Sequence, residues 1–370
     1  MIKHSLKLTQ RDDIMKRVTY ISQATAHVNI DTLGEITRVS QANNKEKNIT
    51  GVLLFFKNIF FQVIEGEAAI IDALYQKILC DSRHDHITCL KTELNIEQRL
   101  FSDWNMKVID LDAEQGIVLE PVKQLLHAVT ESHRVLEHYT QPSVVRIINE
   151  GRNPLECPAR IVPKVIFFAD IVSFSVFAEK LPVHLVMEVV NYYLDICTRH
   201  ITNCGGEVMK FIGDCVMASF PQNKADQAIQ AGIFILEELA HLRASSDPDA
   251  RLLQQLYTGI GISAGDVIEG NIGSAQKMEY TLLGDAVNVA SRLQELSREI
   301  PHALLFTREV MNLSTHGQWP FLSLGSHSIK GKAKKLDIFS INHPIVFKSE
   351  QGKKEADKIK MALDQLKNMV

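Results

Sequence analysis

Two aspartates occupy positions where a folded chain would bring carboxylates together. Asp170 ends the apolar run Val165–Ala169, which is typical of a buried strand, and Asp214 follows Gly213 in a tight turn between two further strands. In an antiparallel βαββαβ sheet the first and third strands are neighbours, so both carboxylates would lie at one edge. Two carboxylates that lie close together at one edge repel each other. A cation such as Mg²⁺, bound jointly with phosphates, would neutralise them. Alternatively, Asp170 only caps a strand and Asp214 only completes a turn.

The segment around this pair alternates between helices and strands. Apolar residues recur at helical spacing over 183–203 and 225–243, and runs typical of strands flank both segments. A further helix over 285–297 follows the strand 257–273, where Gly259 and Gly261 lack the continuation of a dinucleotide-binding motif. This order predicts a ferredoxin-like βαββαβ domain over residues 164–345.

A second pair of polar residues stands in the first third of the chain. Residues 16–111 again follow the order βαββα and then strands, with a hairpin around Lys57-Asn58. Tyr20 lies on the first predicted strand and Gln62 on the third, so the same sheet order would make them cross-strand neighbours. Taken alone, Tyr20 also fits a core tyrosine bonded to some other acceptor.

Residues 112–163 differ in pattern from both flanking segments. Val122, Val129 and Leu136 are spaced seven apart, and this predicts a short heptad seam that ends at Pro142. The complementary positions hold Leu125/Leu126, Ser132/His133 and Tyr139. A second short helix over 143–151 and an extended segment with three prolines would follow. The long helix could dimerise and relay a signal, or pack on its own domain, and the pattern favours neither.

Composition excludes several classes of protein. The formal net charge of −4 over 370 residues argues against a nucleic acid as partner. The six cysteines form no CxxC pair, as expected for reduced thiols in a cytoplasmic protein. The longest apolar stretch is interrupted by Lys57 and Asn58, so no membrane helix or membrane partner is predicted. Residues 1–15 lack the apolar region of a signal peptide and are expected to be an extension, and residues 346–370 form a charged tail without assigned function.

The motifs FFADIVSFS, KFIGDCVMASF, YTLLGDAVNVASRL and IKGKAKK occur in this order within residues 164–341. In order and spacing they resemble the catalytic core of class III nucleotidyl cyclases. The resemblance implies that Asp170 and Asp214, with the carbonyl of Ile171, hold two metal ions, Mg²⁺ or Mn²⁺. Such a clamp would activate the ribose 3′-hydroxyl and neutralise the leaving pyrophosphate.

The resemblance also assigns residues outside the metal pair. Asn288 and Arg292, one helical turn apart, would stabilise the transition state, because an arginine spreads its charge over the reacting phosphorus. Lys330 would contact the triphosphate. Family geometry places the metal carboxylates on one protomer and Asn288 and Arg292 on the other, which implies a homodimer with two equivalent sites. Taken alone, Arg292 and Lys330 also fit a solvated surface.

The choice of base is expected to depend on Lys210 and Thr281. In the family that these motifs resemble, a lysine with an aspartate or threonine reads adenine, and a glutamate with a cysteine reads guanine. Lys210 can donate to adenine N1 and Thr281 can accept from the 6-amino group. Guanine presents the opposite polarity at both positions, and a mismatched buried polar pair costs about 1–3 kcal/mol. ATP is therefore the expected substrate.

The motifs TYIS, NNKEKNITGVLL, FFQVIEGE, DSRH and FSDWNM span residues 16–111 and resemble those of a BLUF domain, a flavin-binding blue-light sensor. The resemblance implies a flavin site made of Tyr20, Asn44, Asn48, Gln62, Asp81, Arg83, His84, Trp104 and Met106. Asn44 and Asn48 would bind the polar edge of the ring, and Arg83 the ribityl or phosphate side. A phenol and an amide beside the flavin could pass an electron and a proton and then rearrange their hydrogen bonds. Whether the flavin is FAD or FMN is left open.

These observations predict an α+β protein of two ferredoxin-like βαββαβ domains joined by a helical, coiled-coil-like linker over residues 112–163. The predicted function is a blue-light-activated adenylate cyclase that forms cyclic AMP from ATP in a homodimer. One alternative is a flavin photosensor with an inactive cyclase-like domain, and another is a guanylate cyclase. A third keeps the cyclase and makes the front domain a small-ligand or dimerisation module.

Overall fold

The protein was analysed as a computed structural model that describes residues 14–25, 30–113, 119–150, 152–244, 253, 256–274, 276–315 and 319–346. The chain divides into two compact units, with the boundary between Cys157 and Pro158. Most of the predicted N-terminal extension and nearly all of the predicted C-terminal tail lie outside the described residues.

The front unit contains a mixed sheet in the strand order β4-β1-β3-β2-β5. Its elements are β1 (Met15–Ala24), α1 (Ile30–Glu46), β2 (Thr50–Phe56), β3 (Ile59–Glu67), α2 (Ala68–Leu79), β4 (His84–Leu94) and β5 (Lys107–Asp110). The first four strands pair antiparallel in the order expected for a ferredoxin-like sheet. The strand β5 adds to the edge of the sheet, parallel to β2.

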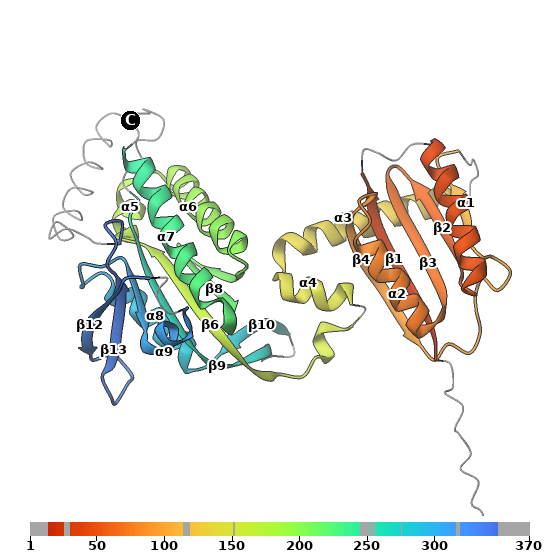
Figure 1. Ribbon diagram of the computed structural model, residues 1–370. Helices are drawn as coiled ribbons and strands as arrows, with labels where there is room; N and C mark the ends of the chain where they lie inside the picture. The colour runs from red at the N-terminus through yellow and green to blue at the C-terminus, as the bar shows by residue number, and fades with distance from the viewer. Residues whose placement is uncertain are drawn as a thin grey trace, which may run out of the picture. The chain divides into compact units, whose positions relative to one another are not determined.

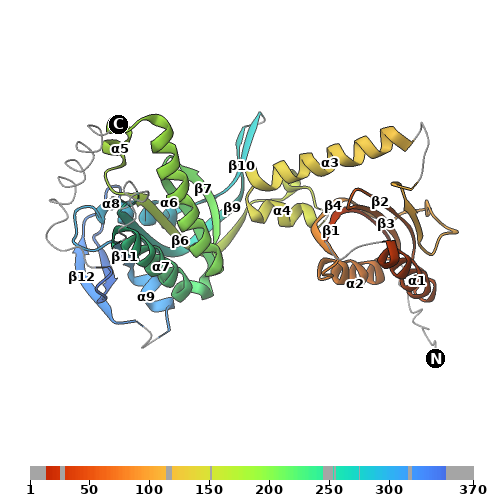
Figure 2. The same cartoon turned by 90° about the horizontal axis from the view of Figure 1, so that it is seen from above.

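Residue chemistry explains both the turn and the core of this unit. Lys57 and Asn58 adopt φ values of 44° and 63°, which a two-residue hairpin turn of this twist requires. The helices α1 and α2 cover one face of the sheet (Figures 1 and 2), where Leu33 and Ile71 pack on Phe60 and other strand residues. This face of the sheet is therefore the one on which Tyr20 is buried.

Two helices predicted as a linker pack on the front unit. In α3 (Leu119–Tyr139), Leu126 is buried against Phe56 and Leu111, on the sheet face opposite α1 and α2. Leu125 and Tyr139 of the same helix are 64% and 88% exposed. Val122 and Leu126, two members of the predicted heptad seam, thus pack on the front unit itself, whereas pairing of the exposed Leu125, Leu136 and Tyr139 with a second copy stays a prediction.

The second predicted helix is present as α4 (Pro142–Asn149), which begins at a proline, as the first turn of a helix allows. It contacts β4, and the Tyr75 hydroxyl of α2 donates to the Asn149 carbonyl at 3.4 Å. The short 3₁₀ turn η1 (Pro154–Glu156) follows it. Both segments therefore belong to the front unit rather than to a free linker.

The second unit is built on a larger sheet, which runs β12-β13-β11-β9-β6-β8-β7 in the described residues, with β10 paired to β9. Its strands are β6 (Arg160–Ile171), β7 (Glu207–Ile212), β8 (Cys215–Pro221), β9 (Thr258–Ser274), β10 (Lys277–Leu283), β11 (Leu304–Thr307), β12 (Phe321–His327) and β13 (Leu336–Ile341). Its helices are α5 (Phe174–Lys180), α6 (Val183–Asn203), α7 (Ala225–Ala244), α8 (Asp285–Leu296) and α9 (Arg308–Leu313), with a 3₁₀ turn η2 (Gln222–Lys224). The four strands β9-β6-β8-β7 form the ferredoxin-like core.

Helices on both faces of this sheet explain the unbroken apolar run before Asp170. Val165 and Phe167 pack in one cluster with α6 and α7, which lie side by side in Figure 1. Ile166 and Phe168 pack in another cluster with Ala286 of α8. A strand buried on both faces has no polar alternation. The strand starts at Arg160, inside the predicted linker, because residues 160–163 pair with β9.

Two further observations concern the chain as a whole. Among the helices in the described ranges, none combines the length and apolar character that a bilayer crossing needs. The six cysteines are all free thiols.

Candidate functional site

The ends of β6 and the β7–β8 turn bring Asp170 and Asp214 together. Ala169 pairs with Val216, so Asp170, next to the last residue of β6, and Asp214, in the turn before β8, lie at the same edge of the sheet. Burial, and then the hydrogen bond and charge of Asp170, raise the pKa of Asp214 to about 7, partly offset by the backbone amides of Asp214 and Ile171. The Asp214 Oδ2 atom is buried without a hydrogen-bond partner in the described structure.

A cationic side chain that the sequence reasoning missed contacts this pair. Arg298, in the turn after α8, donates to Asp170 Oδ2, and the buried Gln294 amide lies 3.4 Å from the same oxygen. Nothing in the sequence pattern singles out Arg298, because its approach to Asp170 depends on where α8 ends. Two carboxylates and a carbonyl fit a metal whose remaining ligands are phosphates and water. Within the described ranges no cluster of three or more His, Cys, Asp or Glu could bind a metal by itself.

The backbone beside Asp170 is fixed by a buried hydroxyl pair. The Tyr193 hydroxyl of α6 lies 2.6 Å from Thr258 Oγ1, and that threonine donates to the Asp170 carbonyl at 3.0 Å. Burial raises the pKa of the neighbouring Cys215 thiol to about 12, so the thiol stays protonated beside the carboxylates. The strand end therefore presents the carboxylates from a rigid frame.

One of the predicted base-reading residues, Lys210, is paired with an acid that sequence reasoning missed. Lys210 on β7 donates to Glu279 on β10 at 3.0 Å. Glu279 lies two residues before Thr281, on the same face of the strand. Thr281 is 7% exposed, and its hydroxyl oxygen is buried without a hydrogen-bond partner in the described structure. An unpaired buried hydroxyl fits a site that a polar ligand completes.

The remaining predicted catalytic residues are not joined to the carboxylate pair by any described hydrogen bond or ion pair. The Arg292 guanidinium on α8 donates to both oxygens of Glu295, at 2.6 and 2.8 Å. Asn288 is exposed one turn earlier on the same helix, and Lys330 is exposed beside Gly331. The expected division of the site between two protomers would leave these residues at the surface of one chain.

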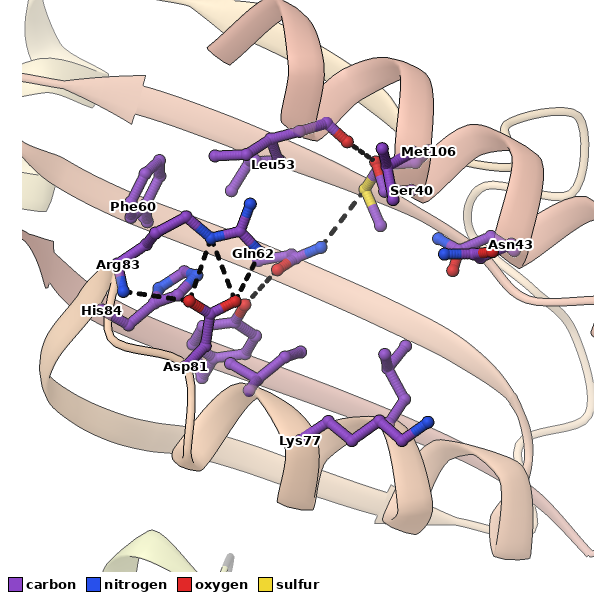
Figure 3. Close-up of a pocket in the computed structure, with 16 residues that line it drawn as sticks. Ser40, Asn43, Leu53, Phe60, Gln62, Lys77, Asp81, Arg83, His84 and Met106 are labelled. Carbon is purple, nitrogen blue, oxygen red and sulfur yellow. Dashed lines mark hydrogen bonds and ion pairs between the residues drawn. The ribbon is translucent and has the colours of Figure 1, made fainter. Parts of the chain in front are cut away.

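The front unit contains a cavity of about 210 Å³ beneath α1 and α2 (Figure 3). The predicted flavin residues that line it are Tyr20, Asn44, Gln62, Asp81, Arg83, His84 and Met106. Asn43, Ser40 and Lys77 also line it and were not singled out in the sequence. Asn44 is 3% exposed, and its Nδ2 lacks a hydrogen-bond partner in the described structure, which fits the polar edge of a ring bound there.

Tyr20, Gln62 and Met106 form a chain of contacts at the floor of the cavity. Tyr20 pairs directly with Gln62 in the register of β1 and β3, and its phenol donates to Gln62 Oε1. The Gln62 Nε2 atom contacts Met106 Sδ at 3.3 Å, and Figure 3 marks this contact with a dashed line. Burial raises the pKa of Tyr20 well above its usual value, so the phenol keeps its proton at neutral pH.

An ion pair and a buried histidine form part of the cavity wall. Arg83 donates to Asp81 from Nε at 2.9 Å and from Nη2 at 2.5 Å, and this hydrogen bonding lowers the pKa of Asp81. Burial lowers the pKa of His84 to about 4, and His84 Nδ1 lies 2.8 Å from Ser22 Oγ. The wall thus offers an anchored guanidinium and a neutral imidazole.

Two predicted flavin residues lie outside this cavity lining. Asn48 adopts φ 51° in the turn before β2, and its Oδ1 accepts from Arg99 at 3.3 Å. Trp104 is half-buried and stacks on Phe101, with ring centroids 5.4 Å apart. Trp104 is two residues from Met106, so the path of the loop before β5 decides which side chain reaches the cavity.

That loop is held by Glu65, a carboxylate with no solvent exposure at the end of β3. Its oxygens accept from Arg17 Nε at 2.5 Å and from the backbone amides of Leu100 and Phe101 at 3.0 and 3.1 Å. Farther along the loop, the Met106 carbonyl accepts from Gln41 at 3.0 Å. Glu65 therefore ties the loop that contains Met106 to the strand that contains Gln62.

Both units match known families. Residues 15–107 match the family described as BLUF, sensors of blue-light using FAD. Residues 160–343 match the adenylate and guanylate cyclase catalytic domain. One match lies in the unit that contains the cavity and the other in the unit that contains the carboxylate pair.

Proteins similar to most of the length of this chain are also known. A solved structure described as a bacterial light-regulated adenylyl cyclase is 46% identical, covers 94% of this chain and 99% of its own, and superposes with a TM-score of 0.85. The photoactivated adenylate cyclase subunit beta of Euglena gracilis is 30% identical over 335 residues, or 89% of this chain. The alpha subunit from the same organism is 32% identical over 293 residues, or 79% of this chain. The chain spans only 38% and 29% of the lengths of these two Euglena proteins.

Proposed function

The chain belongs to the light-regulated adenylyl cyclases that join a BLUF domain to a cyclase catalytic domain, and we propose that it converts ATP to 3′,5′-cyclic AMP and pyrophosphate under blue light. The observation that carries the catalytic part is the Asp170–Asp214 pair, in which a buried carboxylate oxygen lacks a partner. That arrangement is costly by itself and is explained by a cation that binds there.

Asp170, Asp214 and the Ile171 carbonyl would hold two divalent ions, Mg²⁺ or Mn²⁺. The ions would supply Lewis-acid stabilisation of the phosphates and of the ribose 3′-oxygen. The protein fixes the ligands in advance, because Thr258 and Tyr193 hold the strand end. Lys330 would contact the triphosphate, as its exposed position beside Gly331 allows.

ATP is the proposed substrate because the base site presents a lysine and a hydroxyl. Lys210 is oriented by Glu279 at 3.0 Å, and a lysine ammonium can only donate. Adenine N1 accepts, whereas guanine N1 donates, so a lysine there favours adenine. The buried Thr281 hydroxyl would complete the recognition by accepting from the 6-amino group.

A homodimer would complete each site. Asn288 and Arg292 lie at the surface of α8, and a partner chain would receive them beside its own carboxylate pair. The exposed apolar residues of α3, Leu125, Leu136 and Tyr139, would pair between the two copies and transmit the light signal. We also propose a cytoplasmic location, which the free cysteines support.

The proposed light sensor is an FAD bound in the cavity of the front unit. Asn44, and Asn43 beside it, would bind the polar edge of the ring, and Arg83, anchored by Asp81, would serve the ribityl or phosphate side. The Tyr20 phenol would donate its proton in a hydrogen bond to the Gln62 amide oxygen, as it does in the structure. A change of that hydrogen bond would alter the contact between Gln62 and Met106, and with it the loop that Glu65 anchors.

The test is cyclic AMP formation by the purified yellow protein in darkness and under blue light. Asp170→Asn is expected to lower activity at least 100-fold, since even the outer partners of metal ligands contribute about 10–100-fold. Its flavin absorption should be unchanged. Asp337→Asn, which removes an exposed ion pair with Arg308, is the control and should stay active. Near-normal turnover of Asp170→Asn would refute the metal assignment, and a normal flavin photocycle without any cyclic AMP would favour the inactive alternative.

A further inference from the structure

The C-terminal end of α8 places a positive charge on one of the two carboxylates that would bind metal. The Arg298 guanidinium pairs with Asp170 Oδ2, and the Gln294 amide lies 3.4 Å from the same oxygen. Gln294 is 4% exposed, so its amide has few alternative partners. Gln294 lies in the last turn of α8 and Arg298 in the turn that follows the helix, and neither has a role in the reaction proposed above.

Two glycines of β9 allow α8 to come this close. Gly259 pairs with Asp170 across β6 and β9, and a Cβ at Gly259 would overlap the Ser297 hydroxyl oxygen. A Cβ at Gly261 would overlap the Ala290 carbonyl oxygen and the backbone nitrogen of Gln294. Glycines in a strand often mark such close approach of another backbone. These two glycines belong to no dinucleotide-binding motif. They allow Gln294 and Arg298 to reach the sheet edge at which Asp170 and Asp214 lie.

The exposure of Arg298 allows its ion pair with Asp170 to open. Its side chain is 47% exposed, whereas that of Asp170 is 12% exposed, so the guanidinium reaches the carboxylate from the solvent side. A half-exposed arginine can move into water, provided that another cation replaces its charge on the buried carboxylate. A divalent ion on the same carboxylate would repel the guanidinium directly.

We propose that Arg298 is the counter-ion of the Asp170–Asp214 pair in the metal-free enzyme, and that a divalent ion binds by displacing it. The proposal rests on the proposed function, because it takes Asp170 and Asp214 as the metal ligands. Arg298 is then a positioning residue: it balances the two carboxylates before metal arrives and lowers the apparent affinity for the first ion. A role limited to holding Asp170 in place would give the opposite effect on metal affinity.

The test measures Mn²⁺ binding to the full-length protein without nucleotide, by the electron paramagnetic resonance signal of free Mn²⁺. Arg298→Met keeps the length of the side chain and removes its charge, and should tighten Mn²⁺ binding on the order of tenfold, which corresponds to about 1.4 kcal/mol. Arg298→Lys keeps the charge and should stay near the wild-type affinity. Asp170→Asn should abolish the binding that is being measured.

The control is Arg308→Met, which removes an arginine from an exposed ion pair of the same unit and should leave Mn²⁺ binding unchanged. Flavin absorption and the melting temperature report whether each variant is folded. Weaker Mn²⁺ binding in Arg298→Met, or no change, would overturn displacement. Failure of the wild-type protein to form cyclic AMP would instead refute the proposed function, and the Mn²⁺ comparison could still be read by itself.

Discussion

Tyr20 on β1 stands directly opposite Gln62 on β3, and its phenol donates a hydrogen bond to the Oε1 atom of that amide. The same amide faces Met106 through its Nε2 atom, 3.3 Å from the sulfur. Any change in the orientation of the Gln62 amide must therefore exchange a donor and an acceptor at both neighbours. This makes the pair a two-state element of the kind that can start a conformational signal.

Replacing Tyr20 by Phe removes the phenol while the ring still packs. We expect flavin binding and dark cyclase activity to persist, while the light-induced red shift of the flavin spectrum and the light-driven rise in cyclic AMP disappear. Gln62→Leu should have the same effect. Tyr75→Phe is the matched control for the spectral shift, because Tyr75 is also a buried tyrosine, with its ring 5.6 Å from that of Tyr20, but does not line the cavity. A full light response in Tyr20→Phe would show that Tyr20 is only a core residue.

Glu65→Gln should destabilise the front unit and disturb the loop that contains Met106. The substitution leaves Arg17 without its buried partner and places an amide NH₂ near two backbone donors, at a cost of about 3 kcal/mol. We expect a lower melting temperature and a changed rate of recovery after illumination. Glu93→Gln removes the half-exposed partner of the same arginine and should cost under about 1 kcal/mol. Equal effects of the two substitutions would argue against Glu65 as the anchor of the loop.

The base preference should change only when Lys210 and Glu279 are both substituted. Lys210→Glu with Thr281→Cys reverses the polarity toward guanine, but the new carboxylate would face Glu279 across the position of a 3.0 Å ion pair. We therefore expect this double variant to lose cyclic AMP formation and gain little cyclic GMP formation. Adding Glu279→Lys restores an opposite charge and should raise cyclic GMP formation. Competition between ATP and GTP measures the shift, and a wild-type preference for GTP would contradict the hydrogen-bond argument.

Shared sites predict complementation between two inactive variants. Asp170→Asn would lack a proposed metal ligand, and Arg292→Ala would lack the arginine at the surface of α8. In a mixed dimer one site carries both lesions and the other carries neither, so up to about half of the sites regain function when mixed dimers dominate. The measurement is cyclic AMP formation after the two proteins are mixed, with subunit exchange checked by two different tags. No recovery despite exchange would count against the division of the site.

His84 should make the flavin pocket sensitive to acid. Burial lowers the pKa of His84 from 6.5 to about 4, so the unfolded chain takes up a proton at a higher pH than the folded one. The stabilisation is complete above pH 6.5 and falls as the pH is lowered toward 4, by up to about 3 kcal/mol. Flavin release in urea at pH 7 and pH 5 measures this effect in the front unit, and His84→Gln should flatten the difference. The pKa of Asp214 is raised to about 7, and this has the opposite effect on stability. Its ionisation destabilises the second unit as the pH rises.

The sequence by itself determined the strand order and the two juxtapositions that follow from it. Connection rules leave few ways to arrange βαββαβ, and in each unit the first and third strands pair as expected. Asp170 therefore meets Asp214, and Tyr20 meets Gln62. The apolar run before Asp170 also indicated a strand covered on both faces, because it lacks polar alternation.

Only the tertiary structure decided which side chains complete each site. Arg298 reaches Asp170 because Gly259 and Gly261 let α8 approach β9, and no spacing along the chain encodes that distance. Met106 lines the cavity and Trp104 does not, because Glu65 fixes the path of a loop some 35 residues away in sequence. Sheet pairing follows from local periodicity and short connections, whereas these contacts depend on packing between distant segments.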